Sequence, residues 1–218
     1  MRSLVWALGF ALVATSSTAA AAGLDSMKKG DGPAYGDKGT IEVGGLLGFE
    51  SVHSDFKTAG KQDETLFAVE PQVGMFISPG AELLVQLDFV SDALKPEGGS
   101  GTSISLFGGG VGGDYLVKTG SVFVGPELIL QYANASGKFD FGPPVGTVNF
   151  TQSGPGATAG LLAKLPLGGG GVVTLGASYQ YQSLSFKLSS SGASETQSGT
   201  MGAFGTSVGY SVYFGGGS

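Results

Sequence analysis

The sequence predicts an eight-stranded antiparallel up-and-down transmembrane β-barrel, and three observations support this fold class. Apolar and polar residues alternate with period two through most of the chain after Thr40, which is the strand period. The connections between these segments alternate between short and long, as in membrane barrels with tight periplasmic turns and longer external loops. Charged residues make up only 13% of the chain, and 41 of its 218 residues are glycine, whereas soluble domains are about 25% charged.

The N-terminal end is predicted to be a signal peptide covering residues 1–22. Arg2 precedes a short apolar core at 4–13, and small residues at 19–22 offer cleavage sites. The apolar core is shorter than the roughly 20 residues of a spanning helix. Residues 23–39 are polar and glycine-rich and are predicted to form a flexible lead-in. The barrel is expected at 40–214, followed by a short tail at 215–218.

Eight segments carry the strand pattern. Seven are clear and one, at 102–117, is weaker; the clear segments are 40–50, 64–77, 81–92, 121–133, 157–165, 172–186 and 200–214. Short connections are expected at 78–80, 118–120 and 166–171, and long polar loops at 51–63, 93–101, 134–147 and 187–199. Residues 140–153 could hold one more short pairing, so ten strands remain an alternative.

The two faces of these strands differ sharply in charge. One face is uncharged, and we expect it to contact lipid, where a charge at mid-depth costs about 2–4 kcal/mol. The opposite face then lines the lumen and carries a predicted polar cluster: Glu42, Glu70, Glu82, Asp88, Glu127 and Lys164. A soluble ligand-binding barrel with the faces reversed is the alternative.

The predicted lumen is acidic and narrow. Lys164 is its one clear base, and carboxylates buried without partners hold protons or recruit cations and water. Side chains fill the interior of an eight-stranded barrel. We therefore favour a hydrated polar network over an ion path, and a wide aqueous pore is not expected.

Three prolines fall within predicted strands, where proline removes a ladder hydrogen bond. They are Pro71, Pro126 and Pro155. If the hairpin that contains residues 134–147 is centred between Asp140 and Phe141, Pro126 lies opposite Pro155. Two missing donors on one seam would open a lateral route for an apolar molecule, and an ordinary bulge is the alternative interpretation.

The last strand alternates apolar and aromatic residues up to Phe214. This pattern resembles the terminal strand of bacterial outer-membrane barrels, and residues 40–214 resemble the small eight-stranded group of OmpX, the OmpA barrel, OmpW and the opacity proteins. The resemblance implies an outer-membrane location, with outer-membrane lipids as partners. It also implies that Tyr210, Val212 and Phe214 form a signal for the outer-membrane assembly machinery, and that external loops can meet an extracellular ligand.

Several kinds of chemistry have little support in the residues. The chain has no cysteine and one histidine, His53, and its net charge of −6 argues against a nucleic-acid partner. A GxGxxG match at Gly108, Gly110 and Gly113 is not followed by a helix pattern, and a GxSxG match at residues 205–209 has its histidine far upstream. No cofactor or metal is expected.

The function expected from these observations is a non-enzymatic one. A rigid barrel would hold polar loops outward for adhesion, protection or envelope integrity. A narrow channel or lateral conduit for small or apolar solutes is the first alternative. A lipid-modifying enzyme is the second, because His53 has Ser51, Ser54 and Asp55 near it in the sequence.

Overall fold

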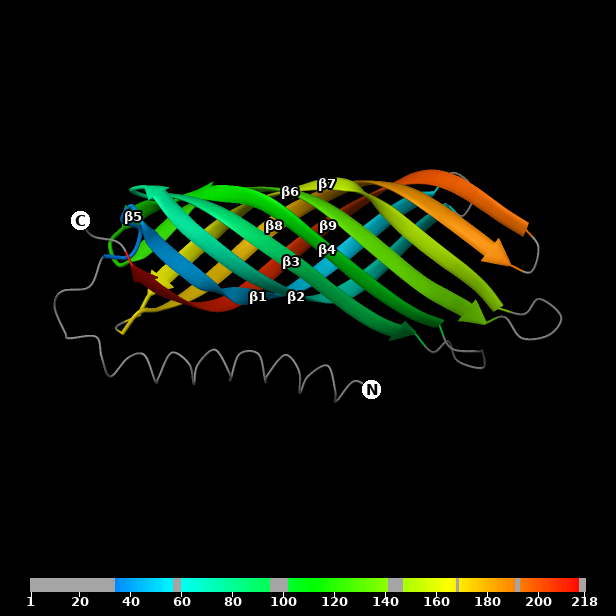
Figure 1. Ribbon diagram of the computed structural model, residues 1–218, viewed down its shortest axis with the longest axis horizontal. Helices are drawn as coiled ribbons and strands as arrows, with labels where there is room; N and C mark the ends of the chain where they lie inside the picture. Colours follow the sequence, from blue (N-terminus) through cyan, green and yellow to red (C-terminus); the bar gives the residue numbers. More distant parts are fainter. Residues whose placement is uncertain are drawn as a thin grey trace.

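The strands close into a barrel in the computed structural model, which describes residues 34–56, 60–94, 102–140, 147–167, 169–190 and 193–215. They are β1 (Thr40–Phe56), β2 (Gly60–Ser78), β3 (Ala81–Leu94), β4 (Thr102–Tyr115), β5 (Val117–Thr119), β6 (Val122–Asp140), β7 (Thr147–Pro166), β8 (Gly171–Ser190) and β9 (Ala193–Gly215). Neighbours pair antiparallel, and β1 pairs with β9 (Figure 1). Because β5 continues β4 along the same neighbour, β6, the barrel is eight-stranded, as predicted.

Within the described residues, no helix is both long enough and apolar enough to span a membrane.

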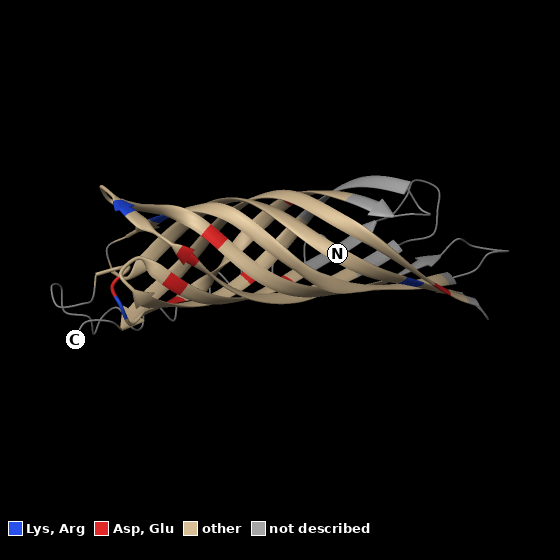
Figure 2. Cartoon of the chain, turned by 90° about the horizontal axis from the view of Figure 1, so that it is seen from above, with Lys and Arg blue, Asp and Glu red and all other residues tan. Residues whose placement is uncertain are grey.

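The apolar face of each strand points outward, as the sequence predicted. Leu161, Val111 and Leu130 are 60–63% exposed on the outside, whereas Glu82 and Lys164 are 3% exposed inside. A soluble barrel would show the reverse distribution, because exposed large apolar patches are rare on soluble monomers. Among the described residues, Figure 2 shows few charged positions along the barrel wall, and most of them lie toward the end at which the C-terminus is marked. The barrel exterior is therefore built for contact with lipid.

The strands are longer than the sequence predicted. The expected loops at 51–63 and 134–147 are largely strand: β1 runs to Phe56, β2 starts at Gly60, β6 runs to Asp140 and β7 starts at Thr147. These outer segments are rich in Ser, Thr, Asn and Gly, so they lack the hydrophobic alternation that marks a strand in the sequence. Their pairing continues the register of the membrane segments without a shift, as from Phe123↔Lys164 to Asp140↔Thr147.

A girdle of outward aromatic side chains, which includes Tyr132 on β6 and Tyr181 on β8, separates the lipid-facing band from the polar outer segments. The outward residues on β6 are apolar from Val124 to Tyr132 and on β8 from Val173 to Tyr181. These runs match the roughly 9–11 residues that a tilted strand needs to cross a bilayer. Beyond the girdle, the following outward side chains among those that the structure describes are exposed and polar, and we call them the outer collar: Asn134, Ser136, Ser183, Ser185, Lys187, Ser194, Thr196, Ser198 and Thr200.

The prediction that Pro126 and Pro155 face each other is wrong. Pro126 lies opposite Leu161 and Pro155 opposite Tyr132, in a β6–β7 ladder that pairs without interruption. The register of the ladder centres the hairpin three residues later than assumed. The two prolines therefore do not form a lateral seam.

Each of the three prolines singled out in the sequence instead lies at a break in a different ladder. The β2–β3 pairing skips Pro71 between Gln72↔Gln86 and Val69↔Phe89. The β7–β8 pairing skips Pro155 between Gly156↔Gln182 and Ser153↔Ser185. Pro126 lies in the break where β4 gives way to β5 along β6. The missing N–H of proline explains these local breaks, and they occur on separate seams.

Candidate functional site

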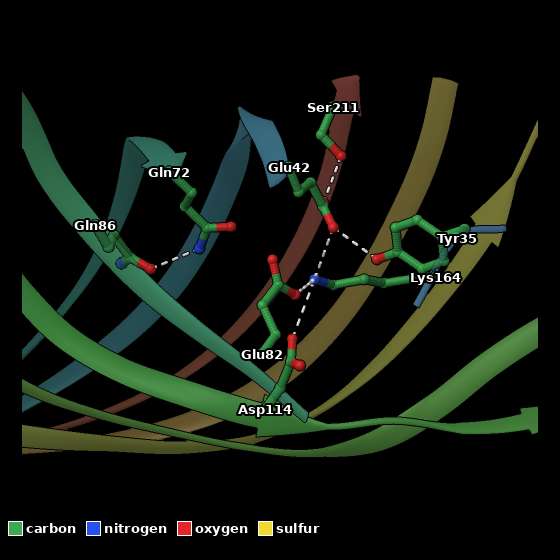
Figure 3. Close-up of polar contacts among 8 residues, drawn as sticks. All are labelled: Tyr35, Glu42, Gln72, Glu82, Gln86, Asp114, Lys164 and Ser211. Carbon is green, nitrogen blue, oxygen red and sulfur yellow. Dashed lines mark hydrogen bonds and ion pairs between the residues drawn. The ribbon is translucent and has the colours of Figure 1, made fainter. Parts of the chain in front are cut away.

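An ion cluster lies inside the barrel near the end that carries the short turns. The Lys164 ammonium lies 2.7 Å from Glu82 Oε2, 3.0 Å from Asp114 Oδ2 and 3.2 Å from Glu42 Oε2 (Figure 3). The four side chains come from β7, β3, β4 and β1, and each is buried. Charges out of water need such pairing, since an isolated buried charge is strongly unfavourable. The cluster therefore ties four strands together across the lumen.

Glu42 is held by two further residues. The Tyr35 hydroxyl donates to Glu42 Oε2 at 2.6 Å, and the Ser211 hydroxyl donates to Glu42 Oε1 (Figure 3). Burial raises the pKa of the Tyr35 phenol, which keeps it a hydrogen-bond donor. Both oxygens of Glu42 thus have partners in addition to Lys164.

Tyr35 also fills the periplasmic mouth of the barrel. Its ring makes edge contacts with Phe76, Phe123 and Tyr213 at centroid distances of 5.1–5.3 Å. Together with Leu116, Leu162 and Val172, these residues form a buried apolar group that we call the periplasmic plug. The end is assigned as periplasmic because its turns are short. The lumen is thus closed by packed side chains at this end.

The prediction of a flexible lead-in is wrong for its last part, residues 34–39. The Gly39 N–H donates to the Phe76 carbonyl at 2.7 Å, and the Gly80 N–H donates to the Gly36 carbonyl at 3.0 Å. Gly36 and Gly39 adopt positive φ angles of 88° and 84°, a region that favours glycine and lets the segment turn into the barrel mouth. Residues 23–33 and the predicted signal peptide lie outside the described residues, as do residues 216–218 of the tail.

Gly74 on β2 makes room for the ion cluster. A Cβ atom at this position would lie 1.7 Å from Glu82 Oε1. Gly74 pairs with Leu84, two residues along β3 from Glu82, and the Glu82 carboxyl group that contacts Lys164 lies against Gly74. A side chain at position 74 would therefore displace the Glu82 carboxyl group.

A second polar group surrounds a cavity of about 50 Å³ higher in the lumen. We call it the acidic cavity; its carboxyl groups are Glu50 from β1, Glu70 from β2, Asp88 from β3 and Glu127 from β6. Gln86 donates to Asp88 Oδ1 at 2.6 Å and to Glu70 Oε2 at 3.3 Å, and Gln72 donates to Gln86 at 2.6 Å. A space of this size holds a few water molecules.

The predicted polar cluster is thus inside the barrel but divided in two. Glu42, Glu82 and Lys164 belong to the ion cluster, while Glu70, Asp88 and Glu127 line the acidic cavity. Sequence reasoning missed Asp114, Tyr35 and Ser211. Asp114 pairs across the sheet with Glu82 and Glu127 at the end of the weak glycine-rich strand, where alternation gave no orientation. A lone tyrosine in a polar lead-in gave no signal for Tyr35.

The motifs weighed for catalysis are separated by the barrel wall. His53 lies on β1, and its side chain is exposed on the outside, as is that of Ser51. Ser207, the serine of the GxSxG match, lines the acidic cavity on the inside. Gly108, Gly110 and Gly113 lie within β4, which pairs on both sides with strands. The structure brings neither pattern into the geometry of a triad or a nucleotide-binding loop.

The residues of the predicted assembly signal lie at the closing seam of the barrel. Tyr210, Val212 and Phe214 on β9 pair with Gly45, Val43 and Ile41 on β1. Phe214 is exposed on the outside near the periplasmic end. Their recognition by the assembly machinery stays a prediction.

The chain is similar in fold to solved bacterial outer-membrane proteins. A major outer membrane protein from Thermus thermophilus matches with a TM-score of 0.57 at 13% identity, covering 80% of this chain and 98% of that chain. The outer membrane protein OprG from Pseudomonas aeruginosa matches with a TM-score of 0.52 at 13% identity, covering 82% and 97%. No protein-family model and no curated protein matches the chain. With its apolar exterior, the chain therefore has the fold of small bacterial outer-membrane β-barrels.

Proposed function

We propose that the protein is a non-enzymatic surface barrel whose outer collar makes contact outside the cell. The observation that carries this proposal is strand length: β6, β8 and β9 contain 19, 20 and 23 residues. That is about twice the 9–11 residues needed to cross the bilayer. The remaining length is a rigid, paired wall that presents hydroxyl and amide side chains.

The closed lumen supports the same proposal. The periplasmic plug and the ion cluster fill one end of the barrel, and the cavities beside and above them measure only about 10 and 50 Å³. Such a barrel conducts poorly while the plug is in place. The exposure of His53 on the outside and of Ser207 toward the lumen argues against a hydrolytic site on this chain.

A shortened collar tests the proposal. In the β6–β7 hairpin, Asn134 pairs with Ser153 and Ala133 with Gly154, so residues 134–153 can be replaced by Asn-Gly, the sequence favoured in two-residue hairpin turns. Cells that produce this variant should attach less to glycan-coated surfaces than cells with the intact barrel. The boiled-versus-unboiled gel shift should remain, as evidence of a closed barrel. Unchanged attachment with equal surface amounts would contradict the proposal.

A lateral conduit for apolar solutes is the second candidate, and one seam favours it. In the described parts of β2 and β3, pairing ends at Ala68↔Val90, although β2 remains paired with β1 to Phe56↔Gly60 and β3 with β4 to Leu94↔Thr102. The two hairpins therefore separate just above the girdle, beside Ala68 and Leu106 of the acidic cavity.

Hydrogen exchange in detergent tests this seam. Amides of residues 60–67 that face β3 should exchange faster than amides of 134–140 in the continuous β6–β7 ladder. Equal protection of the two segments would contradict the lateral conduit.

Lipid mass spectrometry of cells producing wild type or His53→Ala tests for enzymatic activity, and any lipid change that requires His53 would overturn the non-enzymatic assignment.

A further inference from the structure

The outer end of β9 has a free edge at the tip of the β8–β9 hairpin, at the end of the barrel away from the C-terminus (Figure 1). β9 pairs with β8 up to Ala193, but with β1 only up to Gly199, which lies opposite Phe56. β1 ends at Phe56, and the next strand, β2, runs back along it. Among the described residues, none therefore pairs with residues 193–198 on the side of β1.

This edge lacks most of the features that protect edge strands. Natural sheets block their free edges with lysine, proline, bulges or very short strands. Residues 193–198 read ASETQS, with no lysine and no proline, and β9 is 23 residues long. The one charged side chain of this segment, Glu195, accepts a hydrogen bond from the Gln197 amide at 3.0 Å. The edge can therefore form main-chain hydrogen bonds with a further strand.

Symmetry and charge point to a second copy of this chain as the added strand. Two identical edges pair antiparallel about a two-fold axis perpendicular to the sheet, so residues that lie opposite each other share a face, and the register is centred on a residue. Centred on Glu195, it would place two carboxylates opposite each other, which destabilises a sheet. Centred on Thr196, it places Glu195 opposite Gln197 of the second copy. Ser194 then lies opposite Ser198, which gives a favourable hydroxyl pair.

The same axis decides where the second copy lies. An axis perpendicular to the barrel wall crosses the barrel axis, so the two barrels direct their outer collars at each other, as they would in two facing membranes. In a single membrane, the two-fold axis would lie along the membrane normal. Strands tilted by about 35–45° would then cross at the contact instead of pairing.

We propose that the outer collar binds a second copy of this chain on a facing cell, through antiparallel pairing of residues 194–198 of β9 in the two copies. This inference rests on the proposed function, because it names what the outer collar contacts. Thr196 lies on the two-fold axis and meets Thr196 of the second copy. One contact of this length is weak, and the many copies on each cell hold the cells together through avidity.

Charge variants at Thr196 test the pairing, because this residue faces itself across the axis. Cells that display the wild-type barrel should clump more than cells without it at low ionic strength, where charges are least screened. Thr196→Glu cells alone and Thr196→Lys cells alone should lose this clumping, since like charges then meet directly. A mixture of the two strains, each with its own fluorescent label, should regain it and form clumps that contain both labels.

Thr151 provides the matched control. It is exposed on β7, and this strand is paired on both sides there, with Ser136 on β6 and Lys187 on β8, so it has no free edge. Thr151→Glu cells and Thr151→Lys cells should each clump alone as the wild type does. The gel shift on boiling and surface labelling confirm that every variant is folded and displayed in equal amounts.

Three results would overturn the pairing of β9 edges. They are wild-type cells that do not clump, either Thr196 variant alone clumping at the wild-type level, and a mixture that stays dispersed. The last result would assign the edge to a different occupant, such as an extended peptide of another protein. The proposed function fails on a separate observation, unchanged attachment of the variant with the shortened β6–β7 hairpin, and that variant keeps the β9 edge.

Discussion

The Lys164 ammonium lies 2.7 Å from the Glu82 carboxylate, although 82 residues separate the two in the chain. The contact crosses the lumen from β7 to β3, strands that are not neighbours in the sheet. Closure of the barrel is what brings them together. Because both groups are buried and Glu42 and Asp114 contact the same ammonium, the ion cluster is a structural unit that depends on one base.

Replacing that base should destabilise the barrel strongly. Lys164→Met leaves three buried carboxyl groups without a counter-charge, and loss of one partner of a buried pair costs about 3–5 kcal/mol. The free energy of unfolding by urea in lipid vesicles measures the effect. Lys118→Met is the matched control, because Lys118 is exposed on the short strand β5; equal stability of the two variants would show that the ion cluster does not stabilise the fold.

Gly74→Ala should break the contact between Glu82 and Lys164 without removing a charge. The new methyl group occupies the position of Glu82 Oε1, and the displaced carboxyl group loses its ion pair at a cost of about 1–3 kcal/mol. A double-mutant cycle with Glu82→Gln checks the cause, since the two changes should be far from additive. The free energy of unfolding by urea is compared for the four proteins of the cycle. Additive losses would mean that Gly74→Ala acts on something other than the contact between Glu82 and Lys164.

Removing the ring of Tyr35 should open the periplasmic mouth. Tyr35→Ala deletes the side chain that contacts Phe76, Phe123 and Tyr213, with a loss of about 3–5 kcal/mol expected for a large aromatic. Planar-bilayer recordings should change from rare events to steady openings. Tyr35→Phe keeps the ring and loses only the hydroxyl donor to Glu42, so it should stay closed; steady openings of the wild type itself would contradict a closed lumen.

The outer face of β6 should tolerate charge above the girdle and not below it. Leu128→Arg puts a charge against lipid, at a cost of about 2–4 kcal/mol near mid-depth. Ser136→Arg lies on the same outward face of the same strand, in the outer collar, and should cost about 0–1 kcal/mol. Urea unfolding in vesicles compares the two, and equal losses would mean that the membrane boundary does not lie at Tyr132.

The sequence alone determined the class of fold and the direction of its faces. Alternation with period two is a local property, and an uncharged face opposite an acidic one has a single favourable arrangement in a bilayer, with the charges inside. Leu128 and Leu130 outside and Glu82 and Lys164 inside follow from that rule. The same rule does not predict the orientation of the strands beyond the girdle, because both faces are polar there and either face can form hydrogen bonds with water.

Only the tertiary structure decided which strands face each other across the lumen and in what register. The pairing of Pro126 with Leu161 rather than with Pro155 depends on where the turn of the β6–β7 hairpin is centred, which no local pattern specifies. The division of the acids into an ion cluster and an acidic cavity depends on barrel closure, which sets their depths and partners. The position of Tyr35 in the barrel mouth likewise results from packing between segments distant in the chain.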